Sequence, residues 1–136
     1  MIIAVDFDGT IVQHKYPSIG KELPFAVETL RQLASDGHKL ILWTVRSGDT
    51  LEEALAWCRQ RGLQFYAVNS NYPPGSLFSG SKNSSPKIEA DIFIDDHNIG
   101  GIPDWGEIYQ IISGKRRQKH RSRHHTPRWL RKWLQK

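Results

Sequence analysis

The chain has 136 residues, a length that fits one domain with a tail and excludes a large second domain. Hydrophobic residues make up 38% of it, as in folded globular proteins, and its apolar runs are too short to span a bilayer. Residues 1–113 hold nine Lys or Arg and fourteen Asp or Glu, whereas residues 114–136 hold ten Lys or Arg and no acid, so the net charge of +5 comes from a basic tail.

In the first half of the chain, short apolar runs typical of strands alternate with segments whose apolar residues recur at helical spacing. Residues 2–5 predict a buried strand that ends at Asp6. Apolar residues recur at helical spacing from Leu23 to Ala34, and Gly37 ends that pattern. Residues 39–44 predict a second strand, and residues from about 50 to 61 predict a second helix.

The second half continues the alternation after one interruption. Residues 63–68 predict a third strand, and residues 69–86 form a loop rich in Ser, Asn, Gly and Pro. Residues 90–94 predict a fourth strand and residues 104–112 a last helix. This order predicts an α/β fold for residues 1–113, a Rossmann-like and mainly parallel sheet with helices on both faces.

Polar residues follow three of the predicted strands. Asp6 and Asp8 follow the first, Thr44 ends the second, and Asp95 with Asp96 ends the fourth. Because the carboxyl ends of parallel strands share one edge, these side chains are expected to converge. Converging carboxylates repel one another unless they share a cation, and hard oxygen ligands suit Mg²⁺. The sequence therefore predicts a magnesium site formed by Asp6, Asp8, Asp95 and Asp96.

A carboxylate beside Mg²⁺ can attack the phosphorus of a phosphate ester once the charge of the phosphate oxygens is screened. Thr44 is expected to offer its hydroxyl to those oxygens, together with nearby backbone amides such as that of Val45. Lys87 is the preferred cation for the same oxygens, and Lys82 is the competing candidate.

These residues together resemble the four motifs of the haloacid dehalogenase superfamily of phosphatases. The resemblance rests on Asp6-Phe7-Asp8-Gly9-Thr10 after a strand, Thr44 after a second, Lys87, and Asp95-Asp96 after a later strand, and it covers residues 1 to about 113. It implies that Asp6 becomes an aspartyl phosphate and that Asp8 is the catalytic acid and base. Asp6, the Asp8 carbonyl and Asp95 would hold Mg²⁺, with Asp96 assisting.

Many members of that superfamily carry an inserted cap domain, and the gaps between motifs here are too short for one. The chain is most similar to capless bacterial phosphatases. The resemblance therefore implies a hydrolase, a Mg²⁺-dependent phosphatase that hydrolyses small phosphate monoesters through an aspartyl phosphate on Asp6.

Other readings stay open at this point. Receiver domains also combine acids, a Thr and a Lys, so a non-catalytic phosphate-binding or signalling module is an alternative, although the order of the motifs favours the hydrolase. Arg46 can either reach a substrate phosphate or form an internal salt bridge. His14, Lys15 and Tyr16 can either overhang the site or form an exposed loop.

The basic tail, residues 114–136, supports a second kind of interaction. Trp129 and Trp133 are four residues apart, as are Leu130 and Leu134, which predicts one apolar stripe if the end of the tail is helical. The tail can bind nucleic acid, lie on an anionic membrane, or pack on the acidic body or a second subunit. A nucleotide or nucleic-acid-end phosphatase anchored by the tail is thus an alternative function, and a homodimer is compatible with an open site. The amino terminus has no basic, apolar leader pattern, so we expect a cytoplasmic location.

Overall fold

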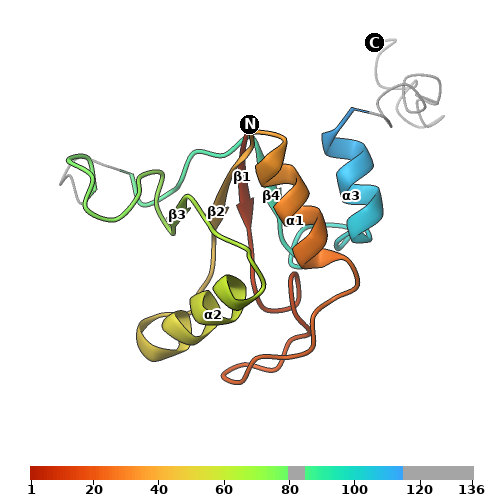
Figure 1. Cartoon of the computed structure of the whole chain (residues 1–136), viewed down its shortest axis with the longest axis horizontal. Helices are drawn as coiled ribbons and strands as arrows, with labels where there is room; N and C mark the ends of the chain where they lie inside the picture. Colours follow the sequence, from red (N-terminus) through yellow and green to blue (C-terminus); the bar gives the residue numbers. More distant parts are fainter. Residues whose placement is uncertain (80–84, 115–136) are drawn as a thin grey trace, which may run out of the picture.

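A computed structural model describes residues 1–79 and 85–114. It contains a four-stranded parallel sheet in the order β3-β2-β1-β4 with three α-helices (Figure 1). The predicted α/β, Rossmann-like fold is confirmed. In chain order the elements are β1 (Ile2–Val5), α1 (Ala26–Ser35), β2 (Lys39–Leu42), α2 (Gly48–Gln60), β3 (Ala67–Val68), β4 (Ile92–Ile94) and α3 (Trp105–Ile112).

The register of the sheet aligns the carboxyl ends of all four strands. Val5 pairs with Leu42 on one side and with Ile94 on the other, and Leu42 pairs with Val68. The residues that come next in the chain therefore lie at one edge of the sheet. This alignment positions the candidate site.

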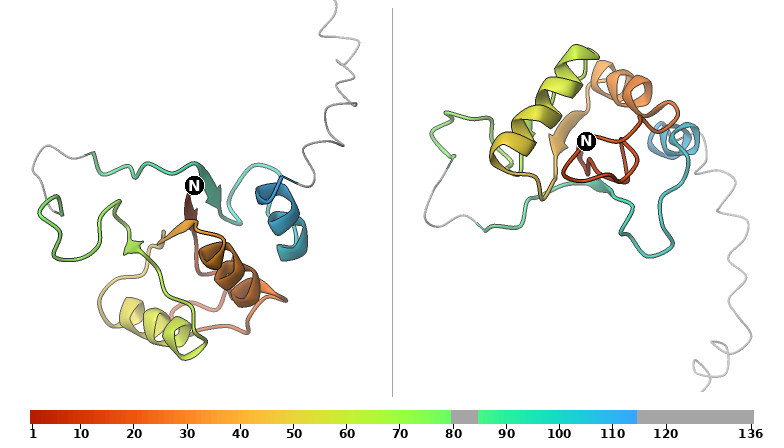
Figure 2. Two further views of the ribbon diagram at one scale, coloured as in Figure 1. Left: turned by 45° about the horizontal axis from the view of Figure 1, so that its top comes forward. Right: turned by 90° about the horizontal axis from the view of Figure 1, so that it is seen from below.

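The main core lies on one face of the sheet, where side chains of β1 and β2 pack with apolar residues of all three helices. Figure 2 shows α1 and α2 on the same side of the sheet. Ile3 and Val5 face this core, whereas Ala4 faces the other side, as the two-residue period of a strand requires. The opposite face carries a smaller cluster in which Ile88 packs with Ala4 and Ile41.

The prediction of helices on both faces was therefore wrong for this sheet. The residues between β3 and β4 place Ile88 against the second face, where the prediction had a helix layer, and Ile88 is only 4% exposed. A short apolar segment is enough because the exposed apolar area on that face is small: Ala4 and Ala67 contribute little side chain there. 

Glycines and one N-cap set the helix ends. Gly37 follows α1 and Gly62 follows α2, both at positive φ, where a glycine ends a helix without steric cost. The Asp104 side chain accepts a hydrogen bond from the Glu107 N–H at the start of α3. No helix among residues 1–79 and 85–114 is long and apolar enough to cross a membrane. The helix expected near the end of the tail lies outside the described residues.

Candidate functional site

A cavity of about 480 Å³ opens beyond the carboxyl ends of the strands. It is bordered by the first polar residues that follow each strand, so it lies where the register of the sheet brings those residues together. Of the five residues expected to converge, Asp6, Asp8, Thr44 and Asp95 border this cavity, with Val45 beside Thr44, whereas Asp96 does not border it. The lining residues are Asp6, Asp8, His14, Trp43, Thr44, Val45, Asn69, Pro86, Asp95 and His97.

Asp6 is the half-buried carboxylate directly after β1. Its backbone N–H donates to the Ile94 carbonyl at 3.0 Å, which continues the pairing of β1 with β4. The Thr10 hydroxyl lies 3.1 Å from Asp6 Oδ2 and 3.4 Å from Asp96 Oδ1, so one hydroxyl serves two carboxylates. Burial, and then the negative charges of Asp95 and Asp96, raise the pKa of Asp6 from 3.8 to about 6.

Asp95, Asp96 and His97 form a cluster after β4, with side-chain ligand atoms within 4.8 Å of one another. Gly9 is the reason that Asp96 can come so close to the first motif. Its φ is +85°, and a Cβ at this position would lie 2.7 Å from Asp96 Cγ. A larger residue at position 9 would therefore push the Asp96 carboxylate away from Asp6.

Asp8 is held differently, by an ion pair with Arg46. Arg46 Nε lies 2.7 Å from Asp8 Oδ2 and Arg46 Nη2 lies 2.7 Å from Asp8 Oδ1, a bidentate arrangement. Both residues are buried, with 7% of Asp8 and 1% of Arg46 exposed. The hydrogen bond with Asp8 raises the pKa of Arg46 above its usual value. Of the two roles left open for Arg46, the structure has the internal salt bridge.

Arg46 also holds the loop that follows the first motif. Its Nη1 donates to the Pro17 carbonyl and its Nη2 to the Ser18 carbonyl, each at 2.9 Å. The guanidinium lies 5.2 Å from the centre of the Tyr16 ring. Tyr16 therefore packs on the ion pair, and of the three loop residues singled out in the sequence, His14 lines the cavity.

Thr44 is fixed at the end of β2 by Asn69, the residue that follows β3. Asn69 Oδ1 accepts from the Thr44 N–H and Asn69 Nδ2 donates to the Thr44 carbonyl, both at 2.8 Å. The Thr44 hydroxyl oxygen accepts from the Arg46 N–H at 3.1 Å, so its proton can point to a ligand. Asn69 had not been predicted as a site residue; its place directly after a strand was the available sequence clue.

Lys87 does not line the cavity. The Lys87 side chain is exposed, whereas the next residue, Ile88, is buried against the sheet. The preceding residue, Pro86, borders the cavity. The Lys87 N–H donates to Ser85 Oγ at 3.2 Å. The alternative, Lys82, lies outside the described residues. Among the described residues the predicted lysine is thus near the site and not in it.

The donor set fits a hard divalent cation. Asp6, Asp95 and Asp96 supply carboxylate oxygens, and the raised pKa of Asp6 means that these charges oppose one another without a cation. His97 offers a nitrogen that Mg²⁺ does not prefer; its side chain is 88% exposed, and its Nδ1 lies 3.9 Å from Asp95 Oδ1 and from Asp96 Oδ1. Arg46 neutralises Asp8, whereas no Lys or Arg of the described residues pairs with Asp6, Asp95 or Asp96.

Comparison with known proteins places the chain next to one solved structure. It is a conserved protein from Bacteroides thetaiotaomicron, 59% identical to this chain, with a TM-score of 0.78 over 85% of this chain and 91% of that one. The chain belongs to the same family as that protein. No protein-family model matches the sequence, and no curated protein matches it. The description of that relative as a conserved protein names no activity.

Proposed function

We propose that this chain is a Mg²⁺-dependent phosphatase of the haloacid dehalogenase superfamily. The observation that carries the proposal is the meeting of Asp6, Asp95 and Asp96 at the carboxyl edge of the sheet, with a raised Asp6 pKa. A structural acid cluster has no reason to bury one carboxylate beside two others. Bound by these three residues, Mg²⁺ would keep Asp6 ionised and screen the oxygens of a phosphate.

In the proposed reaction an Asp6 oxygen forms a bond to phosphorus as the bond from phosphorus to the ester oxygen breaks. The products are an aspartyl phosphate and the leaving alcohol. Water then attacks the phosphorus, the bond to Asp6 breaks, and phosphate and the Asp6 carboxylate are released. The Thr44 hydroxyl and the Val45 backbone border the same cavity and are the proposed contacts for the phosphate oxygens.

Asp8 is the proposed proton carrier, and its ion pair with Arg46 fixes the position of its carboxylate. Both Asp8 oxygens accept hydrogen bonds from Arg46, so the proton exchanged with the leaving oxygen or with the attacking water would use the remaining lone pairs.

The cavity volume favours small substrates. About 480 Å³ lies within the range of roughly 300–1,000 Å³ that small-molecule sites occupy. Because no inserted cap domain occurs among residues 1–79 and 85–114, a phosphorylated oligonucleotide end is the alternative substrate, with the basic tail as its anchor. A small sugar phosphate or nucleotide is the favoured class.

The test is phosphate release from sugar phosphates, nucleotides, phosphorylated oligonucleotides and an aryl phosphate, with and without Mg²⁺. Asp6→Asn should lower kcat by at least about 10³-fold with the thermal unfolding midpoint unchanged or raised. Asp49→Asn, an exposed acid in the first turn of α2, is the matched control and should retain full activity. Equal release by wild type and Asp6→Asn would overturn the mechanism.

A further inference from the structure

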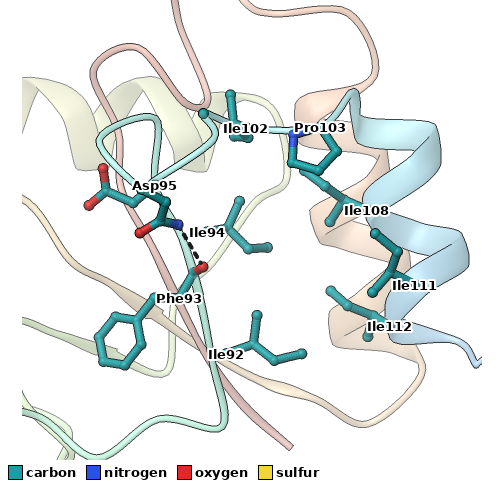
Figure 3. Close-up of a pocket in the computed structure, with 11 residues that line it drawn as sticks. Ile92, Phe93, Ile94, Asp95, Ile102, Pro103, Ile108, Ile111 and Ile112 are labelled. Atoms are coloured by element: carbon teal, nitrogen blue, oxygen red, sulfur yellow. Dashed lines mark hydrogen bonds between the residues drawn. The ribbon is translucent and has the colours of Figure 1, made fainter. Parts of the chain in front are cut away.

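A second, apolar groove lies between β4 and α3 and shares only Asp95 with the lining of the cavity of the proposed reaction. Figure 3 shows Ile92 and Ile94 of β4 pointing toward Ile108, Ile111 and Ile112 of α3, with Ile102 at one end. The groove has a cavity volume of about 130 Å³. An enclosed apolar cavity of about 150 Å³ holds a benzene ring, so this smaller groove, which is open to solvent, can take part of an aromatic ring.

The groove is open because α3 is held by contacts other than those to β4. The Tyr109 hydroxyl donates to Asp36 Oδ2 at 3.0 Å beyond the end of α1, and Trp105 Nε1 donates to the Thr10 carbonyl at 3.0 Å. These contacts place α3 beside α1, at the border of the sheet (Figure 1). β4 is the last strand on this side, and Ile111 remains 43% exposed. The apolar lining of the groove is therefore open to solvent on this side.

The segment that contains all lining residues of the groove is acidic, and the segment that follows it in the chain is basic. Residues 88–114 contain six Asp or Glu and no Lys or Arg, whereas residues 115–136 contain ten Lys or Arg and no acid. The basic segment begins three residues after Ile112, which lines the groove. Trp129, which follows 17 residues after Ile112, can reach any point within about 50 Å along an extended chain.

We propose that residues 128–134 of the same chain dock in this groove, with the ring of Trp129 or Trp133 in the apolar cavity. Burial of part of the ring supplies the apolar contact, and the net negative charge of residues 88–114 attracts the Arg and Lys residues beside it. A linker of 13 residues, 115–127, gives the segment a high effective concentration at the groove. The apolar stripe read from the sequence thus has a site on its own domain.

The experiment uses the full chain labelled with 5-fluorotryptophan. Its five Trp residues give five fluorine resonances, and Trp129→Phe and Trp133→Phe assign the two in the tail. The shift of each resonance between H₂O and D₂O reports its exposure. We expect at least one tail resonance to have a small solvent shift, like that of buried Trp105, at all protein concentrations.

Ile111→Lys puts a cation into the groove and should raise the solvent shift of that tail resonance to the value of a fully exposed ring. Ile99→Lys is the matched control, since Ile99 is fully exposed and does not line the groove, and it should change nothing. Ile111→Gln is the milder variant should Ile111→Lys unfold. The proposal is overturned if both tail resonances have the solvent shift of an exposed ring in the wild type, or if Ile111→Lys leaves their solvent shifts unchanged. It is also overturned if a small solvent shift becomes large on dilution. The last result would assign the groove to a second copy of the chain.

Discussion

The two sides of the candidate site treat their carboxylates differently. On one side Asp8 is buried and held by two 2.7 Å contacts with Arg46. On the other side the Thr10 hydroxyl contacts Asp6 and Asp96, Asp95 borders the cavity with Asp6, and no Lys or Arg of the described residues lines the cavity there. The difference indicates where an added cation would stabilise the protein: beside Asp6, and not beside Asp8.

The largest effect on stability is expected at the paired side. Arg46→Ala leaves the buried Asp8 charge without its partner and removes the hydrogen bonds to the Pro17 and Ser18 carbonyls. We expect a loss of about 3–5 kcal/mol in the free energy of unfolding, measured by urea denaturation. Arg59→Ala, at an exposed position of α2, is the control and should cost less than about 0.5 kcal/mol. A loss below about 1 kcal/mol at Arg46 would mean that the pair is not a structural centre.

The next largest effect is expected where the two motifs approach. Gly9→Ala introduces a Cβ 2.7 Å from Asp96 Cγ at a φ of +85°. We expect a loss of about 1–3 kcal/mol and weaker Mg²⁺ binding, because the Asp96 carboxylate must move. Gly37→Ala is the control for positive φ alone, since nothing lies within 4 Å of its added Cβ. Equal Mg²⁺ affinity in wild type and Gly9→Ala would show that Asp96 does not contribute to Mg²⁺ binding.

The unpaired side is expected to make stability depend on pH. The pKa of Asp6 is about 6 in the fold against 3.8 ordinarily, so the unfolded chain releases this proton first as the pH rises. The contribution of protonated Asp6 to the free energy of unfolding is therefore fully present below about pH 4 and is lost as the pH rises through about 6. The loss is about 1–2 kcal/mol after allowance for solvent screening. The difference between wild type and Asp6→Asn isolates this loss, and saturating Mg²⁺ should restore it. Parallel pH profiles would contradict the proposed origin.

The smallest effect on stability is expected at Lys87. Its side chain is exposed, so Lys87→Gln should change the free energy of unfolding by less than about 0.5 kcal/mol. If the lysine turns toward a bound phosphate, the same variant should raise KM by about tenfold with little change in stability. Lys21→Gln, another exposed lysine, is the control. An unchanged KM would remove Lys87 from the site.

Much of this arrangement could be predicted from the sequence because the fold repeats one rule. Each apolar run ends in a polar residue, and the parallel register then aligns Asp6, Thr44 and Asp95 without further information. The ends of α1 and α2 could be predicted from Gly37 and Gly62, because glycine readily adopts the positive φ that ends a helix.

What could not be predicted depends on contacts between distant segments. The pairing of Arg46 with Asp8 joins residues 38 positions apart. A substrate phosphate is also an anion, so the sequence could not decide which of the two pairs with Arg46. Asn69 is an ordinary loop residue until β3 lies beside β2. Lys87 was expected in the site, but the burial of Ile88 determines which way that segment faces.

The central claim, that the three unpaired carboxylates hold Mg²⁺, is tested most directly by calorimetric titration of the purified chain with MgCl₂. The account predicts one ion per chain in the wild type and at least about tenfold weaker binding for Asp95→Asn with Asp96→Asn, while Asp49→Asn binds as the wild type does. Absence of binding to the wild type, or equal affinity in the double variant, would contradict it.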